Sequence, residues 1–202
     1  MPDPILPKSF YGREPRIVAL ELLGKVLVST ICGTRTSGVI VETEAYLSSR
    51  DSACHGYHGR QNKNAMMFGP AGFAYVYPIH ANYCFNVVTE EVDLPSAVLI
   101  RALQPLDNIT RMKILRGQDD QLSLCSGPGK LCQSLSIGIE CNGIDLTTRR
   151  SVWIEEPTTQ YEDYQDIVAT TRIGVTSAKR SKLRYVFRNN RFASGTRKLN
   201  NP

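Results

Sequence analysis

The stretch Val39-Ile40-Val41-Glu42-Thr43-Glu44-Ala45-Tyr46 decides how this sequence folds. Its first half is a run of β-branched residues, which favours an extended strand over a helix. Strand side chains alternate between faces, so we expect Ile40, Glu42, Glu44 and Tyr46 on one side and Val41, Thr43 and Ala45 on the other. A carboxylate that is partly desolvated at a strand end has a raised pKa and suits general-base chemistry. The alternative is a pair of solvent-exposed glutamates.

The segments on either side predict further strands and one helix. Pro15 suits a first helical position, and apolar residues at helical spacing continue from it until Gly24. Residues 25–31 are strand-like and turn back at 32–34 into the central stretch. On its other side, a polar loop at 47–64 leads to an aromatic strand at 73–77. Alternating aromatics pack in a core or across strands, or they form a platform on which bases stack.

Length and composition indicate one α/β domain over residues 1–202. The chain has a mass of 22.5 kDa, is 42% hydrophobic and 21% charged, and shows no internal repeat or linker. Residues 1–13 are expected to form an irregular N-terminal arm. No apolar run approaches bilayer length, and residues 1–4 lack the features of a signal peptide. Six scattered cysteines without a C-x-x-C pair fit reduced thiols, so we expect an intracellular protein with no membrane partner.

The positive charge is concentrated at the C-terminus. Residues 171–202 contain nine basic residues and no acidic one, whereas the first 170 residues contain 15 basic and 19 acidic. Such a stretch is either a solvated tail or an electrostatic surface for a phosphate backbone. Leu183, Tyr185 and Phe187 alternate as in a strand, which favours a folded basic surface. We therefore expect Lys182 and Arg184 to belong to a surface for a phosphate backbone and residues 193–202 to be a loose tail.

Two local patterns suggest ligands that the rest of the sequence does not support. Cys54-His55-x-x-His58 resembles a zinc half-site, but the one remaining histidine is His80 and no second cluster completes a ligand set. A metal-dependent hydrolase is therefore disfavoured, and no metal is expected. The segment 126–130, Ser-Gly-Pro-Gly-Lys, lacks the spacing of a Walker A loop. It predicts a turn into a helix at 131–135, with a structural role or a phosphate contact through backbone N–H groups.

An ordered set of motifs resembles the alkyladenine (3-methyladenine) DNA glycosylase family. The blocks are Val-Glu-Thr-Glu-Ala-Tyr at 41–46, His55, Tyr-Val-Tyr at 75–77, Tyr-Cys-Phe-Asn-Val-Val at 83–88, Val-Leu-Ile-Arg-Ala-Leu at 98–103, Leu-Cys-Ser-Gly-Pro-Gly-Lys-Leu-Cys at 124–132, Arg-Ile-Gly-Val at 172–175 and Leu-Arg-Tyr-Val at 183–186. They follow the family's order from about residue 14 to 190. Each block alone is a weak signal, and the ordered set is specific.

The resemblance implies a fold and an activity. The family fold is a single mixed α/β domain with a curved, mostly antiparallel sheet, flanking helices and a protruding β-hairpin. Its members are monofunctional glycosylases that flip alkylated or deaminated purines out of double-stranded DNA, hydrolyse the N-glycosidic bond and leave an abasic site. No metal or organic cofactor is implied, and a monomer is expected. The alternative is a catalytically weak protein of the same fold that binds lesions or other nucleic acid.

The resemblance also assigns roles to individual residues. Glu44 matches the general base and Arg101 the basic residue beside the catalytic water and the target phosphate, whereas spacing alone does not choose between Glu42 and Glu44. Four residues match the base pocket, namely Tyr46, His55, Tyr77 and Asn86, with Asn86 near the purine 2-position. The family's wedge tyrosine is missing from a segment that is one residue short. Ile79 or His80 is expected to take its place between the base steps.

Overall fold

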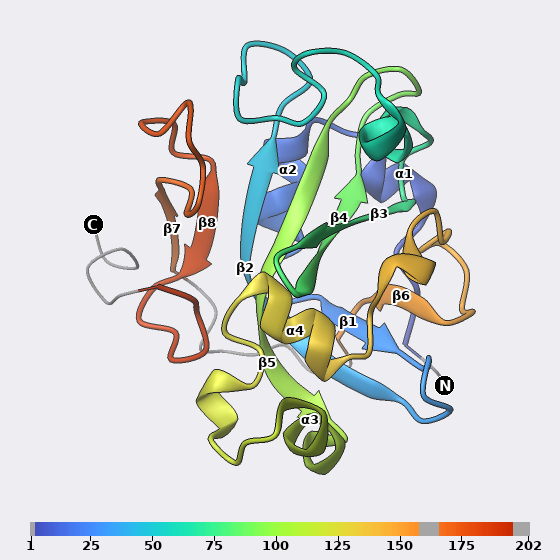
Figure 1. The fold of residues 1–202 in the computed structure, drawn as a ribbon, viewed down its shortest axis with the longest axis vertical. Helices are drawn as coiled ribbons and strands as arrows, with labels where there is room; N and C mark the ends of the chain where they lie inside the picture. Colours follow the sequence, from blue (N-terminus) through green and yellow to red (C-terminus); the bar gives the residue numbers. More distant parts are fainter. Residues whose placement is uncertain (1–2, 158–165, 196–202) are drawn as a thin grey trace.

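The central stretch forms the strand around which the fold is built. The computed structural model describes residues 3–157 and 166–195. Strand β2 (Thr36–Tyr46) pairs along one edge with β5 (Ala97–Asp107). Its other edge is divided, because β1 (Val26–Ser29) pairs with residues 36–39 and β8 (Arg184–Phe187) pairs with residues 42–44. Segments from both ends of the chain therefore meet on β2 (Figure 1).

All strand pairs in the described part of the chain are antiparallel. The sheet runs in the order β3-β4-β5-β2-β1-β6, and β8 joins β2 beside this path and carries β7. The remaining strands are β3 (Ala74–Ile79), β4 (Asn82–Val88), β6 (Val152–Glu155) and β7 (Ile167–Thr170). The sheet curls around the core (Figure 1), and this confirms the expected mixed α/β fold with an antiparallel sheet.

Short helices cover the sheet. They are α1 (Lys8–Tyr11), α2 (Pro15–Glu21), α3 (Ile109–Arg116), α4 (Pro128–Ser134) and the 3-10 segments Asn62–Phe68, Gln121–Ser123 and Ile139–Cys141. Helix α2 begins as predicted at Pro15, and the Glu14 carboxylate caps it by accepting from two backbone N–H groups. Thr43 donates from Oγ1 to the Ala19 carbonyl oxygen at 2.8 Å, which fixes α2 against β2.

Several boundaries differ from the sequence prediction. Helix α4 spans Pro128–Ser134, so it begins inside the segment that was expected to be a turn before a helix at 131–135. The N-terminal arm is partly regular, because residues 8–11 are helical and Ile5 forms a β-bridge with Glu155. The loose tail does not begin at residue 193, because Ala193 and Ser194 are 9% and 7% exposed and pack inside the protein. Residues 196–202 lie outside the described part. No helix in the described ranges is long and apolar enough to cross a membrane.

Strands β3 and β4 form a hairpin whose tip is exposed. Two residues, His80 and Ala81, connect the strands, and the register pairs Ile79 with Asn82. His80 has a φ of 51°, in the left-handed region that two-residue hairpin turns require. The Ile79 side chain is 40% exposed beside it. The shortened segment therefore forms the tightest common hairpin connection, with Ile79 and His80 presented at its end.

Candidate active site

Two β-bulges turn Glu42 and Glu44 of β2 and Arg101 of β5 toward one another. Val41 has no partner on β5, and Arg101 has none on β2, since Ile40 pairs with Leu103, Glu42 with Ala102 and Thr43 with Ile100. A bulge re-aims the side chains that follow it. Ile40 and Val41 consequently both enter the main core, so the prediction that Ile40 shares a face with Glu42 is wrong. Arg101 lies opposite Glu42 and Glu44.

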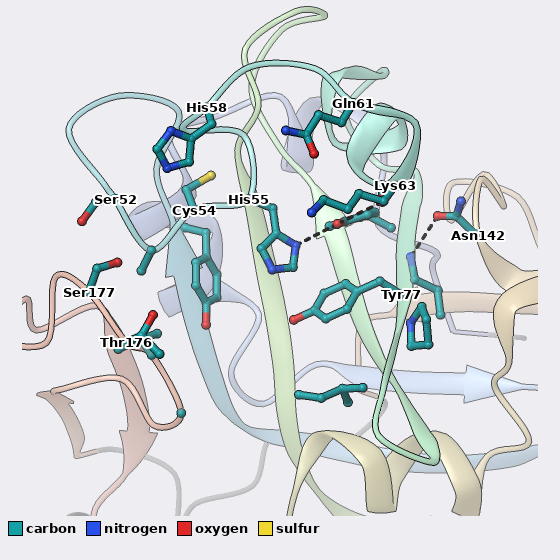
Figure 2. A pocket seen from close by; sticks show the side chains of 18 of the residues that line it. Ser52, Cys54, His55, His58, Gln61, Lys63, Tyr77, Asn142, Thr176 and Ser177 are labelled. Carbon is teal, nitrogen blue, oxygen red and sulfur yellow. Dashed lines mark hydrogen bonds between the residues drawn. The ribbon is translucent and has the colours of Figure 1, made fainter.

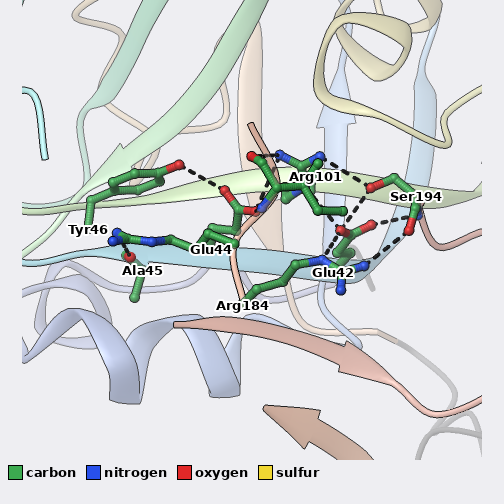
Figure 3. A network of polar contacts seen from close by, with 9 residues as sticks. Glu42, Glu44, Ala45, Tyr46, Arg101, Arg184 and Ser194 are labelled. Atoms are coloured by element: carbon green, nitrogen blue, oxygen red, sulfur yellow. Dashed lines mark hydrogen bonds and ion pairs between the residues drawn. The ribbon is translucent and has the colours of Figure 1, made fainter. Parts of the chain in front are cut away.

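Glu42 lies at the centre of a buried network of charged and polar groups (Figure 3). Its Oε1 accepts from the Nε of Arg101 at 3.0 Å, from the Nε of Arg184 at 2.6 Å and from the Oγ of Ser194 at 2.8 Å. Its Oε2 accepts from the backbone N–H of Ser194 at 2.6 Å. Because every one of these groups is buried, the network fixes the C-terminal segment and β5 against β2.

Arg184 therefore does not have the position that we predicted for it. Its side chain is fully buried, donates to Glu42 and donates through Nη2 to the Ser194 carbonyl oxygen at 3.0 Å. A guanidinium without exposed surface has no access to a DNA phosphate, so the prediction of a DNA contact at Arg184 is wrong. Arg172 is also buried. Lys182 is exposed, and between residues 171 and 195 the other exposed basic residues are Lys179, Arg180, Arg188 and Arg191.

Glu44 is surrounded by hydrogen-bond donors. Its Oε2 accepts from the Tyr46 hydroxyl at 2.8 Å, and its Oε1 accepts from the Ile173 backbone N–H at 2.8 Å. The Nη1 of Arg101 lies 3.4 Å from Oε1. The side chain has no exposed surface. Burial raises the pKa of Glu44 above its ordinary value, against the opposing effects of Arg101, the Ile173 N–H and the Tyr46 hydroxyl.

An aromatic cleft lies directly beyond Tyr46. It has a volume of about 740 Å³, and residues of the loop after β2, of β3 and of the loop between β7 and β8 line it. Figure 2 shows His55 and Tyr77 pointing into this cleft, with Thr176 and Ser177 across from Lys63. At its inner end, Tyr46, His55, Tyr77 and Asn86 line a narrow gap. The structure thus brings together the four residues that were expected to form a base pocket.

The rings of this pocket are in contact with one another. His55 and Tyr77 have centroids 4.7 Å apart at an interplanar angle of 62°, and the His55 Nδ1 shares a 2.9 Å hydrogen bond with the Tyr75 hydroxyl. The Asn86 amide donates to the Tyr75 carbonyl oxygen at 3.0 Å. A planar base between two rings needs them about 7 Å apart, twice a carbon–carbon contact. A base therefore enters between His55 and Tyr77 only after one ring moves.

The suggested zinc half-site has a different arrangement. The Cys54 thiol is turned toward the Pro95 carbonyl oxygen at 3.2 Å, and burial raises its pKa to about 11, which disfavours the thiolate that zinc requires. The His58 ring packs edge-on against Tyr57 at 5.0 Å. No three His, Cys, Asp or Glu side chains within residues 3–157 and 166–195 are grouped as metal ligands. The residues present do not fit a metal centre.

The sequence patterns gave no role to several residues of this site. Ser194 contacts both Glu42 and Arg101, the latter through a 3.3 Å bond from Nη2 to its Oγ. Asp51 and Arg172 form a buried ion pair beside Tyr46. These residues join segments more than 120 positions apart, so no local pattern identifies their partners. The Arg-Ile-Gly-Val motif at 172–175 was one of the blocks that carry the family resemblance, but the resemblance assigned no role to its residues.

Known proteins are similar to this chain over most of its length. The model of the methylpurine-DNA glycosylase (MPG) family matches residues 9–191. A protein of Carboxydothermus hydrogenoformans named "Putative 3-methyladenine DNA glycosylase" is 45% identical over 193 residues, covering 94% of this chain and 98% of its own. Proteins with the same name from Methanoculleus marisnigri and Francisella tularensis are 44% and 43% identical, covering 94% and 87% of this chain and 98% and 91% of their own. The chain belongs to the methylpurine-DNA glycosylase family.

Proposed function

We propose that this protein is a monofunctional DNA glycosylase that removes alkylated or deaminated purines from double-stranded DNA. Its substrates would be of the 3-methyladenine, hypoxanthine or ethenoadenine type, and its product an abasic site. Family membership supports a DNA glycosylase in base excision repair. The observation that carries the proposal is the position of Glu44, a buried carboxylate beside Arg101 that accepts a hydrogen bond from Tyr46, whose ring lines the inner end of the aromatic cleft.

Base flipping would bring the target purine into this cleft. The duplex does not expose the glycosidic bond, so the enzyme must extrude the nucleotide before it acts. Tyr46 and His55 would lie against one face of the base and Tyr77 against the other. Two aromatic faces favour an electron-poor alkylated purine, because a cationic ring stacks more strongly on them. The contact between His55 and Tyr77 opens as the base enters.

The chemical step would be a hydrolysis assisted by Glu44. The ionised carboxylate accepts a proton from a water molecule while the water oxygen forms a bond to C1′ of the deoxyribose. The N-glycosidic bond breaks, and its electron pair leaves with the base. Burial raises the pKa of Glu44 and so makes the carboxylate a stronger proton acceptor than an exposed glutamate. Arg101, at 3.4 Å, would hold the carboxylate in place and attract the target phosphate.

Binding and selection would depend on residues around the cleft. Asn86 lines its inner end, where it would disfavour a purine with an exocyclic 2-amine. The exposed hairpin tip would insert Ile79 or His80 into the space that the flipped nucleotide leaves. Lys182 is exposed in the loop between β7 and β8, other residues of which line the cleft, and there it would contact the phosphate backbone.

The test is base release from defined duplexes. Oligonucleotides that contain hypoxanthine, ethenoadenine or a methylated purine are incubated with the native protein and with Glu44→Gln, and abasic sites are counted after alkaline cleavage. We expect release from at least one lesion by the native protein, and release slowed by about 10²–10⁴-fold or more in the variant. If the native protein binds these duplexes but releases no base from any of them, it is a lesion-binding protein and the proposal fails.

A further inference from the structure

Asp51 and Arg172 form a two-point ion pair inside the protein. The Nη1 and Nη2 of Arg172 each donate to one oxygen of Asp51, both at 2.7 Å. The side chains are 1% and 0% exposed, so the pair is fully enclosed. Asp51 belongs to the loop that follows β2, and Arg172 belongs to the loop between β7 and β8. Both loops line the aromatic cleft, Asp51's loop with Ser52 and Arg172's loop with Thr176 and Ser177 (Figure 2).

Arg172 also contacts the residue that would stack on the base. Its guanidinium carbon lies 4.7 Å from the centroid of the Tyr46 ring, in a cation–π contact. Its Nη1 donates to the Ala45 carbonyl oxygen at 3.0 Å, which fixes the backbone just before Tyr46. Tyr46 lines the cleft, whereas Arg172 does not. The guanidinium therefore supports the ring from the protein side and leaves the other face to the cleft.

The residue after Arg172 contacts the carboxylate that would act as base. The Ile173 backbone N–H donates to the Oε1 of Glu44 at 2.8 Å. A peptide group whose neighbouring side chain is held at three points has little freedom to turn away. The same ion pair thus restrains two groups of the site, the Tyr46 ring and the hydrogen bond on Glu44.

Asp51 is itself fixed in the orientation that this arrangement needs. Its Oδ2 accepts from the Leu47 N–H at 3.1 Å, and its Oδ1 accepts from the Ala53 N–H at 3.2 Å. Burial alone would raise the pKa of Asp51, but the hydrogen bonds from Arg172, Leu47 and Ala53 lower it, so the carboxylate stays ionised. Buried ion pairs contribute little net stability compared with apolar residues of similar size. A positioning role explains an ion pair at this place better than stability does.

We propose that Asp51 and Arg172 are a positioning pair for base excision, which holds Tyr46 in its stacking orientation and the Ile173 N–H on Glu44. The inference rests on the function proposed above and adds residues to it. Arginine is required because its planar guanidinium reaches both oxygens of Asp51, the Ala45 carbonyl and the Tyr46 face together. Lysine would keep the charge but not this set of contacts.

Loss of the ion pair should change the pH dependence of base release. The Ile173 N–H stabilises the ionised form of Glu44, so its displacement raises the pKa of this carboxyl group further. In the described part of the chain, the titratable and charged groups around Glu44 are Glu42 and Tyr46 on β2, Tyr77 on β3, Cys84 on β4, Arg101 on β5, Arg172, and Arg184, the partner of Glu44 on β8. Arg172 is the one of these whose removal would release both Tyr46 and the Ile173 backbone.

The test compares Arg172→Met, Arg172→Lys and Asp51→Asn with the native protein. Arg13→Met is the matched control, because Arg13 makes the same two-point contact with Glu21 but on the surface. The measurement is the single-turnover rate of hypoxanthine release at saturating protein, as a function of pH. We expect a loss of about 10²-fold for Arg172→Met, because misplacement of a reacting group by about 1 Å costs this much. For Arg172→Met, we also expect the acidic limb of the rate–pH profile to move to higher pH. The rate of Arg172→Lys should lie between those of the native protein and Arg172→Met.

Measurements of DNA affinity distinguish a positioning role of the ion pair from a loss of the DNA-binding surface. Arg172 has no exposed surface for DNA, so affinity for undamaged duplex should change by no more than about twofold, as for the surface control. If folded Arg172→Met and Asp51→Asn release base at the native rate with the native pH profile, the pair only joins two loops and the inference is rejected. If Arg172→Met does not fold, the other two variants decide, and if none folds, the pair is a stability element. A native protein that releases no base refutes the proposed function instead.

Discussion

The carboxylates of Glu42 and Glu44, two residues apart on β2, share the guanidinium of Arg101. The Nε of Arg101 lies 3.0 Å from Glu42, and its Nη1 lies 3.4 Å from Glu44. Both side chains are buried, but their other hydrogen-bond partners differ. Glu42 faces Arg184 and Ser194 inside the protein, whereas Glu44 bonds to Tyr46 at the cleft. We infer that Glu42 has a structural role and that Glu44 is the residue available for chemistry.

The first prediction concerns the structural role of Glu42. Glu42→Gln leaves two buried guanidinium groups, Arg101 and Arg184, without their shared anion. Removal of one partner from a buried ion pair costs about 3–5 kcal/mol, so the free energy of unfolding should fall by about this amount. Urea denaturation of the native and variant proteins measures the difference. Equal midpoints and slopes would mean that the network does not stabilise the fold.

The second prediction separates two neighbouring basic residues, Lys182 and Arg184. Lys182→Gln should lower the slope of log affinity against log salt by about 0.9, since each phosphate contact contributes this amount for B-DNA. Arg184→Gln should instead destabilise the protein, because its guanidinium is buried against Glu42. Titrations of undamaged duplex at several salt concentrations, with unfolding curves for both variants, test this. A slope unchanged in Lys182→Gln would place that charge away from DNA.

The third prediction concerns the hairpin tip. If His80 fills the space left by the flipped nucleotide, His80→Ala removes a stacking contact worth about 1–3 kcal/mol and makes flipping roughly 5- to 100-fold less favourable. The loss should be smaller for a mispaired lesion, whose extrusion costs less. Single-turnover release of hypoxanthine opposite thymine or cytosine, by the native protein, His80→Ala and His80→Tyr, measures this. Equal native and alanine rates on both duplexes would exclude His80 as the wedge.

The fourth prediction concerns the pH dependence of base release. A general base acts only when ionised, so the rate should fall as the pH drops through the pKa of Glu44. Burial raises that pKa above the ordinary glutamate value of about 4.3, so the fall should begin at a higher pH than for an exposed glutamate. Single-turnover rates at saturating protein over a range of pH values give the curve. A rate that remains constant down to about pH 4.3 would contradict a buried glutamate base.

The sequence predicted the parts of the fold that local chemistry determines. The β-branched run at 39–41 forms a strand, Pro15 begins a helix, and the aromatic run at 73–77 forms one strand of the hairpin. Alternation also placed Glu42 and Glu44 on one face correctly. It failed at Ile40, because a strand pattern has a strict period of two and contains no sign of the bulge at Val41.

The sequence did not reveal which charged and polar residues are buried against partners far away in the chain. Arg184 and Ser194 occur in a basic, polar stretch that is typical of a surface, but Glu42, more than 140 positions away, binds both of them inside the protein. A charged residue is buried only where a partner compensates it, and composition does not reveal that partner. For the same reason, Asp51 and Arg172 had no predicted role until the fold brought their loops together.

We propose above that Glu44 is the base that activates water for release of the damaged purine. The most direct measurement is the single-turnover release of hypoxanthine by Glu44→Gln and by Glu42→Gln, each normalised to folded protein and to bound duplex. We expect Glu44→Gln to lose at least about 10²–10⁴-fold in rate, the usual contribution of a general base, and still to bind duplex. Glu42→Gln should keep most of its rate per folded molecule. Native-like release by Glu44→Gln, with release lost in folded Glu42→Gln, would contradict the account.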